Sequence, residues 1–471
     1  MKLVKKPMFW IMFGALVLRL IGLNQSLWLD EGVQVQTARL SLRQLFVQHF
    51  PSDFNPPLSY LITYFWLKLF GASEISLRLP SVIFGLASVY LLYLISNELF
   101  PKKKLLSRAA ALLMATAPLH IYYSQEVRPY SLACFLVLAA VYWFLRLVNN
   151  PSKRCARCYT LCVVLMLYSH YLTWLMLPVF WLGTKLLKPN KKTIKSLLFT
   201  NYCLLIAIFP WLPFLFKQLR FGWTQAASLP VWGQTVGSVS LKSLVLVPLK
   251  FTIGRISLDN NLVYALLLLP VLSLIGALLF RAWQKKTKPA LFVWLWLILP
   301  LGLGALISLK LPVFFYFRFL FVLPAFYLLL LWGLQSSAKK HQAILLEALL
   351  AINLICSTLY LAFPCFHREN WRRAVQALHL RNQQAAPVLI IPEVSQPFAY
   401  YDQGESKLLT YGQIDQLSDQ NFVWLVKYAQ PIFEPDNKTE KMLIKNRWQS
   451  IYEADFRGVT IKKFISLKNE R

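Results

Sequence analysis

Apolar segments long enough to cross a lipid bilayer recur along most of this sequence, with short basic loops between them. A helix needs about 20 apolar residues to span a hydrocarbon core of about 30 Å, and there it must satisfy all of its own backbone groups. Hydrophobic residues make up 57% of the chain, above the roughly 45–50% typical of soluble domains. The sequence therefore predicts a mainly α, polytopic helical membrane protein.

We expect about eleven transmembrane helices before residue 362. The apolar segment 57–70 is too short to span and is predicted to lie at the membrane interface. Residues 158–187 are predicted to form a tight hairpin of two short helices, with His170 at its outer tip. Besides the two hairpin helices, the predicted spans are 8–23, 79–99, 105–120, 129–147, 197–215, 261–280, 290–308, 319–334 and 343–362.

The basic residues set the expected orientation. The first 362 residues contain 35 Lys+Arg and 8 Asp+Glu, and the basic ones gather in alternate loops. Cytoplasmic loops are enriched in Lys and Arg, so we expect a cytoplasmic N-terminus in the plasma (inner) membrane. Three loops, 24–78, 121–128 and 216–260, are then extracytoplasmic. This loop bias accounts for the net charge of +30, so nucleic acid is not an expected partner.

The tail has a different pattern and a nearly balanced charge. Residues 363–471 contain 15 Lys+Arg and 12 Asp+Glu. Residues 372–381 are predicted to form a helix, and the apolar runs 387–391 and 422–426 are predicted strands. We therefore divide the chain into a transmembrane domain, 1–362, and a small C-terminal extracytoplasmic α/β domain, 363–471.

Two adjacent carboxylates, Asp30 and Glu31, follow Trp28 where the first predicted helix leaves the membrane. One interpretation is structural: Asp30 caps a helix over 31–40, and Glu31 suits its first turn. The other is catalytic, because an ionised carboxylate at the membrane surface can accept a proton from a hydroxyl group. The two interpretations are compatible.

The second external loop brings Glu126, Arg128 and Tyr130 within a few residues of one another. Arginine suits bidentate recognition of phosphate. The alternative is a surface ion pair of little energetic value. Because the helices that carry this loop and Asp30 are close in sequence, we expect both to face one cavity.

Several other polar residues lie beside apolar spans. Charges at such positions are costly and often functional, although a long side chain can also reach the lipid headgroups. His170 is a candidate base or ligand, or a tip residue with local hydrogen bonds only. Asn55 precedes two prolines that can simply punctuate a helix start. The cations in this group are Arg19, Lys250, Arg255 and Arg318.

An ordered series of motifs resembles the GT-C glycosyltransferases of the family 39 type, which include protein O-mannosyltransferases and lipid A aminoarabinose transferases. The resemblance covers about residues 8–335. Its motifs are Trp28-Leu29-Asp30-Glu31, Asn55-Pro56-Pro57-Leu58, Leu77-Arg78-Leu79-Pro80-Ser81, Ser124-x-Glu126-x-Arg128-Pro129-Tyr130 and Arg318-Phe319, and Asn370-Trp371-Arg372-Arg373-Ala374 is similar to bacterial members.

The resemblance implies transfer of a sugar from a polyprenyl-phosphate donor to a lipid, glycan or protein hydroxyl, with Asp30 as the general base. Asn55 stands where many members have His. No cofactor is implied, and a divalent metal is left open. The alternative is a transporter or flippase of lipid-linked sugars. The expected site residues are Asp30 and Glu126 (catalytic), Arg128, Arg318, Lys250 and Arg255 (donor phosphate), and Glu31, Asn55, Tyr130, His170 and Arg78 (substrate).

Overall fold

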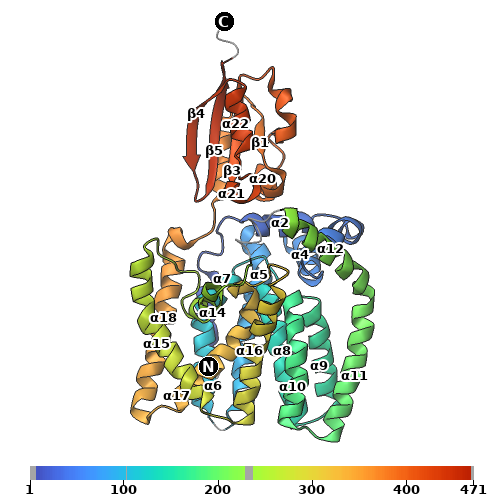
Figure 1. Ribbon diagram of the computed structural model, residues 1–471, viewed down its shortest axis with the longest axis vertical. Helices are drawn as coiled ribbons and strands as arrows, with labels where there is room; N and C mark the ends of the chain where they lie inside the picture. The colour runs from blue at the N-terminus through green and yellow to red at the C-terminus, as the bar shows by residue number, and fades with distance from the viewer. Residues whose placement is uncertain (1–6, 102, 229–236, 468–471) are drawn as a thin grey trace.

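The computed structural model describes residues 7–101, 103–228 and 237–467, and it shows a bundle of helices with a sheet standing on one end (Figure 1). The bundle helices are α1 (Pro7–Leu20), α5 (Glu74–Leu99), α6 (Lys104–Thr116), α7 (Pro118–Ser124), α8 (Tyr130–Asn149), α9 (Lys153–Leu167), α10 (Met176–Leu187), α11 (Lys191–Ile208), α15 (Asn261–Trp283), α16 (Lys288–Ile307), α17 (Leu323–Gln335) and α18 (Lys339–Ala362).

Every predicted span corresponds to one of these helices. Within the described ranges, seven helices are long and apolar enough to cross a membrane, or eight if the bent pair α6–α7 is one span. The other three predicted spans are the shorter helices α1, α9 and α10. The two hairpin helices lie beside α8 and α11 (Figure 1) and meet near His170, as predicted. The chain is thus a mainly helical, multi-pass membrane protein.

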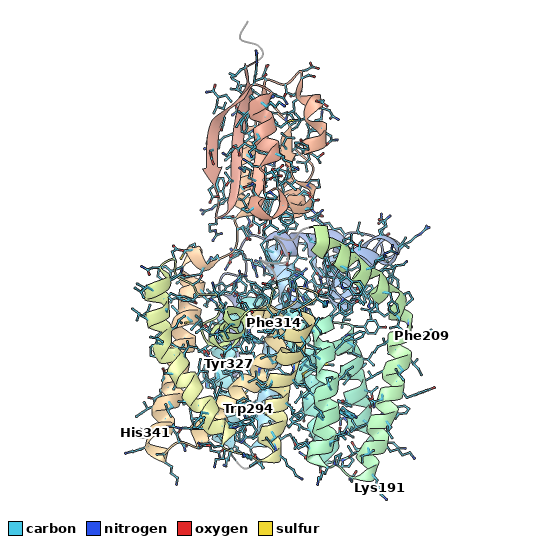
Figure 2. All side chains as sticks on the ribbon, in the orientation of Figure 1. Lys191, Phe209, Trp294, Phe314, Tyr327 and His341 are labelled. Atoms are coloured by element: carbon cyan, nitrogen blue, oxygen red, sulfur yellow. The ribbon has the colours of Figure 1, made fainter. Side chains whose placement is uncertain are left out.

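The end of the bundle nearest the sheet is covered by short helices. Both α2 (Leu29–Ala38) and α12 (Leu212–Ser228) lie there, as does α4 (Leu58–Phe70), the predicted interfacial helix (Figure 1). The predicted loop 216–260 therefore contains helix, since it includes most of α12 and all of α14 (Leu241–Ile253). Figure 2 shows Lys191 and His341 at the opposite end of the bundle.

The buried guanidinium of Arg19 stabilises the break between α6 and α7. These two helices bend by 58°. Pro118 has no N–H, so the chain cannot bond the carbonyl of Met114 in the usual way. Arg19 donates to this carbonyl at 3.4 Å and to that of Ala115 at 3.1 Å, and its Nε donates to Ser124 Oγ at 3.2 Å. This intramembrane cation therefore has a structural explanation.

The tail contains one five-stranded sheet in the order β2-β1-β3-β5-β4. Strand β1 pairs in parallel with β2 and β3, and β5 pairs antiparallel with β3 and β4. The expected helix is α19 (Trp371–Arg381), and α20 (Ser395–Asp402) faces the bundle (Figure 1). The strands are β1 (Val388–Ile390), β2 (Leu408–Leu409), β3 (Phe422–Tyr428), β4 (Trp448–Asp455) and β5 (Val459–Ser466), of which only β1 and β3 are predicted from the sequence.

Candidate active site

Helix α2 begins two residues earlier than an Asp30 cap would allow. Its N-cap residue is Trp28, whose backbone N–H donates to Glu31 Oε2 at 3.4 Å. The predicted capping role of Asp30 is therefore wrong, because Glu31 satisfies the cap from the third helical position. Asp30 lies in the first turn, and its side chain is 36% exposed.

Glu31 is fully buried and bound on both carboxylate oxygens. Arg78 Nε donates to Oε1 at 2.8 Å and Nη2 to Oε2 at 2.5 Å, and the backbone N–H of Val127 donates to Oε1 at 2.9 Å. Arg78 also donates to the carbonyls of Leu23, Gln25 and Ser26. This ion pair joins α2, α5 and the loop before α8.

Asp30 faces arginines. Arg128 Nη2 lies 3.5 Å from Asp30 Oδ2, and Arg128 Nε is buried without a hydrogen-bond partner among the described groups. Arg318 bonds the carbonyl of Pro312 at 3.1 Å and lies within electrostatic reach of Asp30, Arg128 and Tyr130. The loops that carry Asp30 and Arg128 are predicted to face one cavity, and the fold brings these charges together at the sheet-facing end of the bundle.

His170 completes one side of this cluster. Its ring centroid lies 5.9 Å from that of Tyr130, and its Nδ1 accepts from the backbone N–H of Leu172 at 3.2 Å. Burial, Arg318 and Arg128 lower the pKa of His170 to about 3. The imidazole is therefore neutral at pH 7, with Nε2 carrying the proton.

Glu126 points to the other side of the loop. Its Oε2 accepts from Arg368 Nη2 at 2.5 Å, whereas its buried Oε1 has no partner among the described groups. Burial raises the pKa of Glu126 to about 7, although the charge of Arg368 opposes the shift. No sequence motif marks Arg368. It comes two residues before the Asn370-Trp371 segment, and that proximity is its only signal.

A second pair near Arg128, the half-buried His49 and the buried Asp53, also has no motif. His49 Nε2 lies 3.5 Å from Asp53 Oδ2, and the charge of Arg128 acts on Asp53. Burial raises the pKa of Asp53, but the neighbouring His49, the backbone N–H of Phe54 and the charge of Arg128 together hold that pKa below its ordinary value. Asn55, two residues on, is half-buried, and its carbonyl accepts from Gln218 Nε2 at 3.3 Å.

The other two predicted phosphate ligands have different surroundings. Lys250 Nζ donates to the carbonyl of Ile256 at 2.7 Å and bonds the hydroxyl of Tyr264 at 3.1 Å, so it closes its own loop. Arg255 is exposed and donates to the Tyr122 hydroxyl at 2.9 Å, on the Glu126 side of the site. Arg255 thus remains available to a ligand, and Lys250 is occupied.

The cluster carries an excess of positive charge. With every group ionised, Arg128, Arg255, Arg318 and Arg368 outnumber Asp30 and Glu126. A partly exposed carboxylate beside several arginines can accept a proton while the arginines hold an anion. The described residues contain no group of three or more His, Cys, Asp or Glu side chains that could hold a metal ion. Fold and site together define a polytopic membrane protein with a cluster of carboxylates and arginines at one end.

Comparison with known proteins shows which families and structures this chain is similar to. Residues 55–216 match the family model described as dolichyl-phosphate-mannose-protein mannosyltransferase. The structure of ArnT from Cupriavidus metallidurans bound to undecaprenyl phosphate matches with a TM-score of 0.62 at 11% identity, over 97% of each chain. AglB from Archaeoglobus fulgidus, an oligosaccharyltransferase in complex with an inhibitory peptide and a dolichol-phosphate, matches with a TM-score of 0.57 at 10% identity, over 96% of this chain and 73% of that chain. A search of curated proteins finds no match.

The chain therefore has the fold of the GT-C glycosyltransferases, and the resemblance inferred from its loop motifs is confirmed.

Proposed function

We propose that this protein is a membrane glycosyltransferase that moves a sugar from a polyprenyl-phosphate donor to a hydroxyl acceptor, with Asp30 as the general base. The observation that carries the proposal is the pairing of a partly exposed Asp30 with Arg128, at 3.5 Å, within a cluster of arginines. The acceptor is a lipid, glycan or protein, and membrane lipids surround the bundle. The structural relatives bind undecaprenyl phosphate or dolichol-phosphate, which fits such a donor.

In the proposed reaction, Asp30 takes the proton of the acceptor hydroxyl. The hydroxyl oxygen attacks the anomeric carbon, and the bond between that carbon and the phosphate oxygen breaks. The electron pair leaves with the polyprenyl phosphate. A positioned base accelerates such a step by roughly 10²–10⁴-fold. Arg128 and Arg318 stabilise the charge that develops on the phosphate, which is usually the larger contribution.

Each remaining site residue has a proposed place in this mechanism. Tyr130 and His170 line the side of the site next to Arg128, and Asn55 contributes from the loop before α4. Arg255 is a second phosphate ligand, and Glu126 orients substrate from the opposite side of the loop. The three residues engaged within the protein, Glu31, Arg78 and Lys250, act by holding the loops in place.

We further propose that the active site and the domain 363–471 are extracytoplasmic, with 1–362 as the membrane domain in the plasma (inner) membrane. Lys191 and His341 mark the opposite end of the bundle (Figure 2), which carries the basic loops expected in the cytoplasm. A transporter would need charged groups near the membrane midplane. Here the carboxylates of the site gather at one end.

The test compares Asp30→Asn with wild-type protein purified in detergent. The substrate is a panel of radiolabelled polyprenyl-phosphate hexoses and pentoses, offered with a membrane extract as acceptor. Because Asn cannot take the proton, release of polyprenyl phosphate falls by about 10²-fold or more. Asp259→Asn is the matched control, since Asp259 is an exposed loop carboxylate. An Asp30→Asn rate above about a tenth of wild type would exclude Asp30 as the base.

A further inference from the structure

The tail touches both acidic elements of the candidate site. Helix α2, which carries Asp30, packs against α20 of the tail, and a Cβ built on Gly32 would lie 2.7 Å from the backbone nitrogen of Pro397. The Tyr401 hydroxyl accepts from the backbone N–H of Leu27 at 2.8 Å. The loop that carries Glu126 meets the tail through Arg368. The tail is therefore in direct contact with the groups around Asp30.

Arg368 is the residue that joins these elements. Its guanidinium lies between two aromatic rings, 3.8 Å from the centroid of Trp28 and 4.5 Å from that of Tyr122. In the same position it donates to Glu126. A planar guanidinium can stack on aromatic faces and pair with a carboxylate at the same time. An ammonium group cannot do both in this geometry. Arg368 thus fixes Trp28, the residue before α2, and Glu126, which lies two residues before Arg128.

The charges around Glu126 oppose one another. Glu31 and Asp30, both on α2, disfavour its ionised form, and so does burial. Arg368 and Arg128 favour the ionised form, with Arg368 the stronger of the two. Arg255 also faces Glu126 from the loop after α14, and Tyr122, Tyr123, Tyr316 and Tyr360 surround the same group. Removing Arg368 would therefore shift Glu126 toward its neutral form at neutral pH.

We propose that Arg368 is a positioning residue of the active site: delivered by the tail, it holds Glu126 in place and favours its ionised form, and it holds Trp28 so that Asp30 faces Arg128. This inference rests on the proposed function, and it assigns the C-terminal domain a part in turnover. Undocking the tail would remove Arg368 from Glu126 and release the start of α2 together. Arg368 acts through its neighbours and is not itself required to touch the reacting atoms.

The first experiment follows kcat/KM against pH for wild type, Arg368→Gln, Arg368→Lys and the control Arg373→Gln in the full-length protein. Arg373 is an exposed arginine of α19. We expect Arg368→Gln to lose about fivefold at pH 7 and to recover toward pH 9, because raising the Glu126 pKa from about 7 by about one unit lowers its ionised fraction at pH 7 from about a half to about a tenth. Arg368→Lys keeps the charge and should retain more activity at pH 7. A loss by the same factor at every pH, or no loss, would overturn the proposal.

The second experiment needs no turnover. Hydrogen exchange is measured over residues 29–38 and 125–129 in the same four proteins, with undecaprenyl phosphate as the added probe. Faster exchange in both segments for Arg368→Gln, with Arg373→Gln unchanged, supports the proposed docking, and equal exchange in all four proteins refutes it. If wild type releases no polyprenyl phosphate from any donor, the proposed function fails, while this result still decides whether Arg368 holds the two segments.

Discussion

The same change, from carboxylate to amide, should have opposite effects at the adjacent residues Asp30 and Glu31. Glu31→Gln leaves an amide oxygen that can still accept from Val127, but it removes the negative charge from a fully buried pair. Breaking a buried ion pair by changing one partner costs about 3–5 kcal/mol. Arg78 keeps three backbone carbonyls as partners, so we expect the lower end, about 3 kcal/mol.

The assay is thermal unfolding in detergent, with Asp30→Asn as the matched neighbour. The Glu31→Gln variant should melt at least about 5 °C below wild type, because a loss of this size lowers the melting temperature by several degrees. Asp30→Asn, at a partly exposed position, should melt within about 1 °C of wild type while losing turnover. Equal melting temperatures for the two variants would refute the assignment of Glu31 to structure and of Asp30 to chemistry.

Three further predictions follow from the same geometry. Arg128→Lys keeps the charge but loses the guanidinium fork, so turnover should fall about tenfold or more; wild-type kinetics would make Arg128 a surface cation. Gly32→Ala should lower both melting temperature and turnover by overpacking the contact with α20, at about 1–3 kcal/mol, whereas Gly14→Ala, with open space at its Cβ, should do neither. Cysteines placed at the exposed Ser52 and Ser418, in a background free of native cysteines, should both react with a membrane-impermeant reagent in intact cells, and labelling of either only after lysis would contradict the proposed orientation.

Local sequence patterns determined much of this architecture. Every predicted span has its helix, the short apolar segment 57–70 became α4, and the hairpin turns at His170. These features were accessible because hydropathy and helix length are properties of neighbouring residues. The resemblance also placed Asp30 and Arg128 among the site candidates, and the fold brings them into contact.

Tertiary structure alone decided the surroundings of each charge. Asp30 and Glu31 are neighbours in one helical turn, yet packing against α5 buries one beside Arg78 and leaves the other partly exposed. Glu126 and Arg368 are 242 residues apart, and only docking of the tail brings them within 2.5 Å. The residue type gives a side chain's charge, but its burial and its partners depend on which distant segments pack together. Those two quantities decide whether a carboxylate supports the fold or accepts a proton.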